Sequence, residues 1–184
     1  ANNTNAANAI TLAQLQTVVG ADAINTNLAV YQAAIFNAGT GTLSTAALIQ
    51  NLVDAANTNA TTAINAINAA AGSTSLANAI TLDQLQAVVG ADAISANLAA
   101  YRAAIVNADA GSLSTEGLIK VLVYGVNEAT TAITAINAAA GDTSRLNAIT
   151  LAQLQAVVGA DAINANLAVY RLAIVTAGTN TLST

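Results

Sequence analysis

The feature that most constrains this fold is an internal repeat. The run Asn-Ala-Ile-Thr-Leu, followed shortly by Val-Val-Gly-Ala-Asp-Ala-Ile, begins at Asn8, Asn78 and Asn147, which gives a period of about 70 residues. Residues 78–106 and 147–175 are identical at 25 of 29 positions. In such arrays each copy is one structural unit that buries its exposed face on the neighbouring copy. The elements of one copy are therefore expected to recur in the others.

The repeat divides the chain into a linker and three copies. The expected boundaries are 1–7 for the linker from a preceding copy, 8–77 for the first copy, 78–146 for the second and 147–184 for a partial third. Because both ends of the sequence fall inside the period, we expect this chain to be an excerpt of a longer natural array.

The composition excludes several classes of function. Four basic and nine acidic residues give a net charge of −5, and no basic cluster exists that would attract nucleic acid or anionic membranes. The chain has no Cys and no His, so disulfides and nucleophilic sites of the Ser/His/Asp or Cys/His type are impossible. No apolar run approaches the roughly 20 residues of a membrane span. We therefore expect no enzyme activity and no cofactor.

Each copy opens with a signal for a helix start. Thr11, Thr81 and Thr150 each precede a Leu and are followed three residues later by Gln, which is the pattern of a capping box. The Ile before each Thr should pack on the Leu that lies four residues after that Thr, as Ile10 would on Leu15, and so form a hydrophobic staple. The pattern predicts a short helix over Leu12–Val19, ended by Gly20, and its counterparts in the other copies.

A second helix is predicted to follow almost at once. Asp22, Asp92 and Asp161 are placed to act as its N-caps. In the first copy its apolar stripe would consist of residues spaced by four, three and four, namely Ile24, Leu28, Tyr31 and Ile35.

The third helix is the longest, over about Thr45–Ala71 and Thr115–Ala140. The first copy has one extra residue near Asn57, and one residue rotates the rest of a helix by about 100°. We therefore expect a kink or break there. Helices of about 8, 16 and 26 residues, without any strand pattern, predict an all-α fold. Because Ala dominates them, the helices should approach closely and gain stability by stacking as a solenoid-like rod.

The recurring Asp and Tyr residues each allow two interpretations. An Asp at one fixed place per copy could bind calcium, but each stands alone in Gly-Ala-Asp-Ala, so helix capping is favoured. Tyr31, Tyr101 and Tyr170 could form a ladder of binding aromatics or could fill an Ala-rich core with their hydroxyls at the surface. Their place on the apolar stripe favours the core.

Asn is a poor helix former, so its recurrence on predicted helices needs a reason. Side-chain hydrogen bonds between copies or chains, which would fix the register, are one interpretation, and plain solvent exposure is the other. The residues concerned are Asn27, Asn97 and Asn166 in the second helix, and Asn65, Asn68 and Asn137 in the third. Glu116 and Glu128 lie twelve residues apart on one predicted helix, too far for paired acid–base chemistry.

The run at Ala148–Ile174 resembles helical tandem repeats of very large secreted bacterial proteins of the adhesin and RTX type, and the order of short helix, Gly, Tyr-bearing helix and long Leu/Ile helix in the repeat matches theirs. The resemblance implies secretion and a role at the cell surface or in the extracellular matrix. The leading hypothesis is a non-enzymatic structural segment, either a spacer or the subunit of a self-assembling filament or sheath. The alternative is a binding module that holds a glycan or peptide on a face lined by Tyr and Asn.

Overall fold

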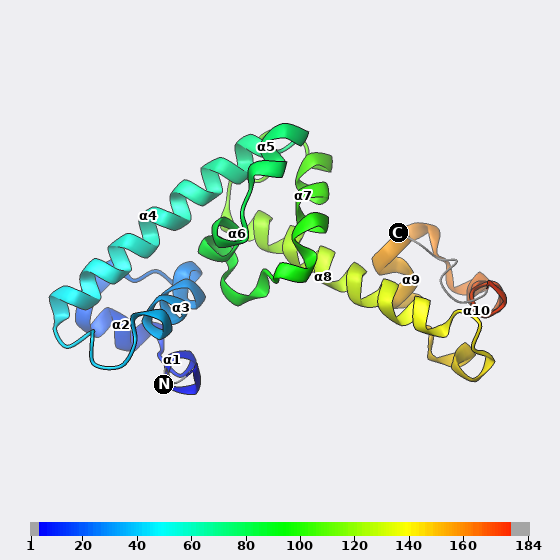
Figure 1. Cartoon of the computed structure of the whole chain (residues 1–184), viewed down its shortest axis with the longest axis horizontal. Helices are drawn as coiled ribbons and strands as arrows, with labels where there is room; N and C mark the ends of the chain where they lie inside the picture. Colours follow the sequence, from blue (N-terminus) through cyan, green and yellow to red (C-terminus); the bar gives the residue numbers. More distant parts are fainter. Residues whose placement is uncertain (1–3, 178–184) are drawn as a thin grey trace. The chain divides into compact units, whose positions relative to one another are not determined.

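The computed structural model describes residues 4–177, and every regular element within them is helical, which confirms the predicted all-α class. The ends of the predicted linker and third copy, residues 1–3 and 178–184, lie outside the described part. Contacts group the chain into two compact units, residues 1–123 and 124–184, and the division falls within the long helix α8 (Figure 1).

The first unit contains seven helices, four 3₁₀ turns and the beginning of α8 among its described residues. In chain order these are α1 (Thr4–Asn8), α2 (Leu12–Val19), η1 (Gly20–Asp22), η2 (Asn25–Asn27), α3 (Leu28–Ala38), α4 (Ala46–Ala70), α5 (Thr74–Ala79), α6 (Leu82–Val89), η3 (Gly90–Asp92), η4 (Ser95–Asn97), α7 (Leu98–Asn107) and α8 (Glu116–Ala139).

The second unit begins within α8 and repeats the same order of elements. After α8 come η5 (Thr143–Ala148), α9 (Leu151–Val158), η6 (Gly159–Asp161), η7 (Asn164–Asn166) and α10 (Leu167–Thr176). The short helices α2, α6 and α9 each end at a Gly with a positive φ, for example 66° at Gly20. Only Gly adopts this backbone conformation without strain, which explains why each short helix stops there.

The second helix is shorter than predicted because the segment before it is extended. Ala23 and Ile24 have extended dihedral angles, and Ile24 is exposed rather than part of an apolar stripe. The Gln16 side chain donates from Nε2 to the carbonyl oxygen of Ala23 at 3.0 Å, which satisfies this backbone without a helix. Gln86 and Gln155 repeat the bond in the other copies. Helix α3 therefore begins only at Leu28.

The segments expected to be plain linkers are themselves helical. In the first unit α1 packs on α3 and α5 packs on α7. The side chain at one fixed position of the Tyr-bearing helix holds the end of each linker: Gln32 Nε2 donates to Ile10 O at 2.8 Å, Arg102 Nε to Ile80 O at 2.8 Å, and Arg171 Nε to Ile149 O at 2.7 Å. The few cations of the chain thus include two that serve local structure.

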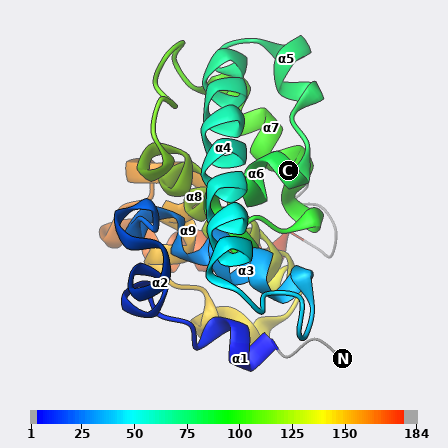
Figure 2. The ribbon, with the colours of Figure 1, turned by 90° about the vertical axis from the view of Figure 1, so that its left-hand side faces the viewer.

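The predicted kink in the first long helix is wrong: α4 runs unbroken through Asn57 (Figures 1 and 2). Its buried residues keep helical steps of three and four across the extra residue, namely Val53, Ala56, Ala60, Ala63, Ile67 and Ala70. Helix α4 packs on elements of both copies, so no single partner along its length requires the original rotation. The extra residue turns the side chains after it around the helix axis. They meet other neighbours as a result, but the helix itself is not interrupted.

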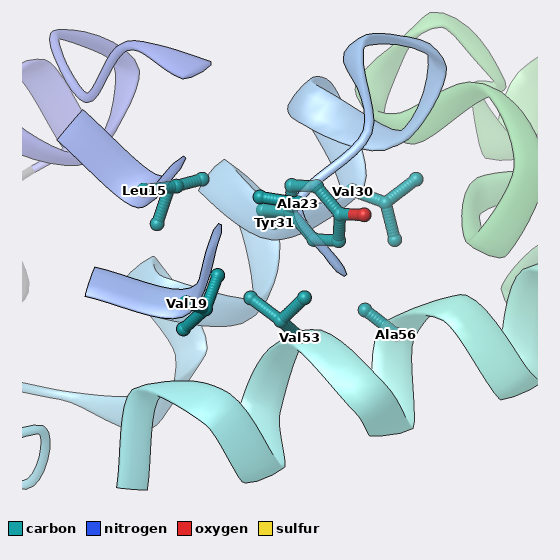
Figure 3. Close-up of a cluster of buried hydrophobic side chains, with 7 residues drawn as sticks. All are labelled: Leu15, Val19, Ala23, Val30, Tyr31, Val53 and Ala56. Atoms are coloured by element: carbon teal, nitrogen blue, oxygen red, sulfur yellow. The ribbon is translucent and has the colours of Figure 1, made fainter. Parts of the chain in front are cut away.

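Helix α4 belongs to two cores. Its first half packs on α2 and α3, where Val53 and Ala56 complete a cluster with Leu15, Val19, Ala23, Val30 and Tyr31 (Figure 3). Its second half packs on α5, α6 and α7 (Figure 2). Among the described residues no helix is both long and apolar enough to cross a membrane.

Candidate functional site

The most elaborate polar arrangement in the first unit surrounds the hydroxyl of Tyr31. The ring is fully buried, and the hydroxyl accepts a hydrogen bond from the backbone N–H of Ile24 at 3.2 Å. It donates to Oδ1 of Asn57 on α4 and lies 3.4 Å from the carbonyl oxygen of Asp22. A buried phenol needs such partners, so the Tyr hydroxyl fixes the irregular segment before α3 against α4.

Asn57 is the centre of this arrangement. Its Oδ1 also accepts from Nδ2 of Asn27 at 2.7 Å, and its own Nδ2 donates to the carbonyl oxygen of Asp22 at 2.9 Å. Asn27 is only 5% exposed. Neither a bond to another copy or chain nor plain exposure, the two interpretations of Asn27, describes its side chain, because it is buried and its partner lies in the same copy. Sequence reasoning did not select Asn57 for this role.

The three Tyr residues differ in burial. Tyr101 is fully buried like Tyr31, accepts from Ile94 N at 3.2 Å and lies 3.5 Å from the carbonyl oxygen of Asp92. The core interpretation is correct for both, although their hydroxyls lie inside the fold and not at its surface. Tyr170 is only partly buried, and its hydroxyl lies 3.3 Å from the carbonyl oxygen of Asp161.

The Asn residues that precede the Tyr-bearing helices differ in the same way. Asn97 is buried, like Asn27. Asn166 is exposed and is paired with the hydroxyl of Tyr170 at a long distance of 3.5 Å. A 3.5 Å bond is at the limit of useful geometry, so the arrangement in the third copy is looser than in the first.

The prediction that Asp22, Asp92 and Asp161 cap the second helix is wrong. Each ends a 3₁₀ turn several residues before that helix, and the N-cap positions are taken by Asn27, Asn97 and Asn166, whose side chains make no capping bond. The carbonyl of each Asp faces a Tyr hydroxyl instead. The free backbone groups of the turn, rather than a helix start, explain why this segment needs polar side chains.

The carboxylate of Asp22 makes a surface contact. It accepts a hydrogen bond from Nε2 of Gln50 at 2.9 Å, and the same amide donates to Asp54. Nowhere in residues 4–177 do three or more Asp, Glu, Cys or His side chains gather as metal ligands would. Asp22 thus serves the contact between its turn and α4.

The three predicted capping boxes are present. The hydroxyls of Thr11, Thr81 and Thr150 accept from the backbone N–H of the Gln three residues later at 3.1–3.2 Å, and that Gln side chain accepts from the Thr backbone N–H at 2.8 Å. Each box satisfies two backbone donors that the helix leaves free. The sites predicted at these Thr residues are structural.

Contacts between copies in the first unit use backbone and Asn groups. Oδ1 of Asn68 accepts from the backbone N–H of Leu113 at 3.1 Å, which is the kind of register bond expected of the helix Asn residues. The N–H of Gly72 donates to Ile105 O at 3.3 Å. Asn65 is exposed, and Asn137 is partly buried. One Asn of this group therefore links two copies.

Helix α3 of the first copy also approaches η3 of the second copy closely. A Cβ atom added at Gly90 would lie 3.1 Å from the Cβ of Ala29, whereas the equivalent Gly20 and Gly159 have open space there. Small residues thus allow the two copies to approach, as the high content of Ala predicts.

Glu116, at the start of α8, also links the two copies of the first unit. Its carboxylate accepts a hydrogen bond from the side chain of Thr26, which lies in the first copy. Partial burial raises the pKa of Glu116, and the Thr26 bond and the nearby charge of Lys120 oppose this rise. The carboxylate of Glu116 thus takes part in a contact between the two copies of the first unit.

A groove opens on the second unit between α9, η6 and α10. It has a volume of about 450 Å³ and is lined mainly by apolar side chains. We call it the open groove and define it by Leu154, Val158, Ala162, Tyr170, Ala173 and Ile174. The remaining lining residue is Asp161, so the groove has one carboxylate and a phenol among its polar groups.

Two smaller grooves lie within single units. One in the first unit, of about 350 Å³, lies between α3, α4 and α6 and has Asp83 as its one acidic lining residue. One in the second unit, of about 390 Å³, has Glu128 and lies between α8 and α9. Neither brings two carboxylates together, so neither has the pairing that hydrolytic acid–base chemistry uses.

No protein-family model matches this chain, and no curated protein or solved structure is detectably similar to it.

Proposed function

We propose that this chain is a non-enzymatic structural segment of a secreted bacterial surface protein or of an extracellular filament or sheath. In this proposal successive copies stack into a solenoid-like rod, and copies or chains associate with one another. The role is mechanical: the segment sets a length or builds a fibre. Its location would be the cell surface or the extracellular space.

One observation supports this proposal above the others: a single long helix completes two cores. Val53 and Ala56 in the first half of α4 bury against α2 and α3, and the second half of α4 packs on α6 of the next copy. Neighbouring copies therefore share an element, and each copy depends on the next for part of its buried surface. Such sharing is what gives repeat arrays their length-dependent stability.

The bonds between copies give further support. Asn68 to Leu113 and Gly72 to Ile105 join the first and second copies, and the N–H of Gly141 donates to Val175 O at 3.0 Å within the second unit. Gly72 and Gly141 occupy the same repeat position, and their acceptors, Ile105 and Val175, are one position apart near the end of the next Tyr-bearing helix. Such bonds would recur at every junction of a longer array.

The alternative, a binding module for a glycan or peptide, has less support. Tyr31 and Tyr101 are buried and their hydroxyls are engaged inside the fold, so they offer no aromatic face to a ligand. Only Tyr170 is partly exposed among the three repeated Tyr residues. A glycan array probed with the whole chain would revive this alternative if it gave a signal lost in Tyr170→Ala.

The proposal is tested by comparing a single copy with the whole chain. Residues 8–77 alone would leave the second half of α4 without α6, so we expect this fragment to unfold at least about 10 °C below the full chain, with a broader transition. Circular dichroism during heating measures both. If the single copy unfolds as sharply and at the same temperature as the full chain, the copies do not depend on one another and the proposal fails.

Electron microscopy of the purified chain separates the two structural roles. Filaments that lengthen with protein concentration would support a self-assembling sheath or fibre, because near-identical surfaces favour regular head-to-tail contacts. Isolated particles at every concentration would support a spacer.

A further inference from the structure

The open groove of the second unit matches a groove that is filled in the first. Each of its six residues occupies the same repeat position, with the same residue type, as a residue of the first copy. The counterparts are Leu15, Val19, Ala23, Tyr31, Ala34 and Ile35. In the first copy four of these form one core cluster with Val53 and Ala56 of α4 (Figure 3).

The side chains that α4 covers in the first copy are more buried than their counterparts in the open groove. Val19 is 7% exposed, whereas its counterpart Val158 is 51% exposed. Leu15 and Leu154, at the base of the two grooves, are both buried. The lining of the two grooves is therefore equivalent, and the difference lies in the absence of a covering helix among the described residues of the second unit.

We propose that the open groove is the docking site for the first half of a long helix from another copy of this repeat. The inference rests on the proposed function, since it assigns the surface through which copies join. The occupant is an amphipathic helix with the pattern of Ala46–Asn57, which places one aliphatic, one small and one amide side chain on a single face.

Both long helices of the chain contain the aliphatic and the amide residue of this pattern at the same spacing. Val53-Asp-Ala-Ala-Asn57 in α4 corresponds to Val123-Tyr-Gly-Val-Asn127 in α8, so Val and Asn recur four residues apart while the residues between them vary. In a helix this spacing places both side chains on one face. The pattern is thus a repeated property of the long helices, as a repeated docking function requires.

The polar groups beside the groove specify the Asn of the occupant. In the first copy Asn57 accepts from Tyr31 and Asn27 and donates to the carbonyl of Asp22. In the third copy the corresponding groups, on Tyr170, Asn166 and Asp161, pair with one another at 3.3 and 3.5 Å and with no other residue that the structure describes. An incoming Asn would give each of them the partner that its counterpart has, whereas an aliphatic residue there would not.

Other occupants fit the groove less well. A second copy of this chain cannot insert its own α4 without exposing the Val53 and Ala56 side chains that its first core uses. A small apolar ligand could fill the volume, but it would leave the Tyr170 hydroxyl without the amide partner found in the first copy. A long helix that is not already committed to a core satisfies both requirements.

The test extends the full chain by one helix. Leu182-Ser183-Thr184 has the sequence that precedes Ala46, so a copy of residues 46–71 can be added directly after Thr184. We expect amide hydrogen exchange in α9 and α10 to slow at least tenfold relative to the unextended chain, because a docked helix suppresses local opening. Exchange in α2 and α3, which already have their helix, should not change.

A matched control has the same extension with aspartate at the position copied from Val53. It keeps the length and the helical sequence but places a charge where the groove is apolar, so it should leave exchange in α9 and α10 at the unextended rate. A second control replaces the Asn copied from Asn57 with Ala and should give intermediate protection, with the loss greatest around Tyr170.

Equal exchange rates for the native and the aspartate extensions, whether both slow or both fast, would overturn the docking proposal. That result is separable from a failure of the proposed function. If residues 8–77 still unfold well below the full chain, the copies depend on one another through contacts other than this groove. If they do not, the structural role fails as well.

Discussion

The first and third copies have nearly the same sequence in α2–α3 and α9–α10, yet their side chains have different environments. Val30 is 8% exposed and Val169, its counterpart, is 65% exposed. Both residues begin the same Val-Tyr pair in the same helix. Burial in this fold therefore depends on the neighbouring long helix and the next copy, and only partly on the local sequence.

The contacts of Val30 identify the neighbours concerned. Val30 lies in a groove lined by Ala56 of α4 and by Gln86 and Ala87 of α6. None of the elements that correspond to α4 and α6 follows α10 among the described residues. A Val in this repeat is therefore a core residue only when it has both partners, and the stability of a copy depends on its position in the array.

The largest difference is expected when the equivalent Tyr is removed from the first copy and from the third. Tyr31→Ala should lower the free energy of unfolding of the first unit by about 3–5 kcal/mol, because it removes a fully buried ring and leaves polar groups unpaired. Tyr170→Ala should cost the second unit about 1 kcal/mol, since the ring is partly exposed. Native-state hydrogen exchange reports each unit separately.

Tyr31→Phe provides the control, because it keeps the ring and removes only the hydroxyl. It should cost about 1–2 kcal/mol. Equal losses for Tyr31→Ala and Tyr170→Ala would mean that the covering helix contributes little to the first core.

A second test concerns the close approach between copies. Gly20, Gly90 and Gly159 share a positive φ near 65° and an extended ψ, so replacement by Ala should cost about 1–3 kcal/mol at each. Gly90→Ala should cost the most, since its Cβ would meet Ala29 at 3.1 Å while the other two face open space. Urea denaturation of the three variants measures the difference. If all three cost the same, the contact between α3 and η3 relaxes freely.

The polar arrangement around Tyr31 gives a smaller effect. Asn57→Ala removes an acceptor for two side chains and a donor to the Asp22 carbonyl, and it should destabilise the first unit by about 1–3 kcal/mol. Asn59→Ala, two residues along the same helix at an exposed position, should change stability by less than about 0.5 kcal/mol or raise it slightly. Thermal denaturation of the pair checks this. A neutral Asn57→Ala would show that water replaces the amide without cost.

Local structure with a short sequence signature could be predicted well. The Thr-x-x-Gln boxes at Thr11, Thr81 and Thr150 and the stop at Gly20 involve residues within a few positions of one another, so the pattern determines the geometry. The all-helical class followed from the same local signals. The stacking of copies into a rod stays a prediction, because it depends on contacts that a single copy does not contain.

The errors arose where a side chain has a distant partner. Asp22 has the preferences of an N-cap, but the segment after it is extended. Gln16, which precedes this segment, donates to the carbonyl oxygen of Ala23, and Tyr31, which follows it, accepts from the N–H of Ile24. The kink expected near Asn57 treats the long helix as packing on one partner, whereas α4 packs on elements of two copies. The sequence places Asn57 at the expected break in the helix. Only its hydrogen bonds with Tyr31 and Asn27 reveal that it joins α4 to the segment before α3.

The linkers before the second and third copies offer the finest comparison. In the first unit Ser73 precedes α5 and makes no side-chain cap bond. In the second unit Asp142 stands at this position and accepts from the backbone N–H of Ser144 at 2.9 Å and from its hydroxyl at 2.6 Å. These bonds, with a smaller contribution from Arg145, hold the pKa of Asp142 below its ordinary value.

A lowered pKa in the folded state means that ionised Asp142 favours folding. The contribution is complete above about pH 4, where the unfolded aspartate is also ionised, and it is lost as the pH falls through the folded pKa. Asp142→Ser, which copies the first linker, should therefore lower the urea midpoint of the second unit slightly at pH 7 and make no difference at about pH 2. Because the Asp142 side chain is 42% exposed, salt should weaken the effect at pH 7. A difference that is the same at both pH values would assign it to the loop backbone, and the two linkers would then differ in conformation without any role for the charge.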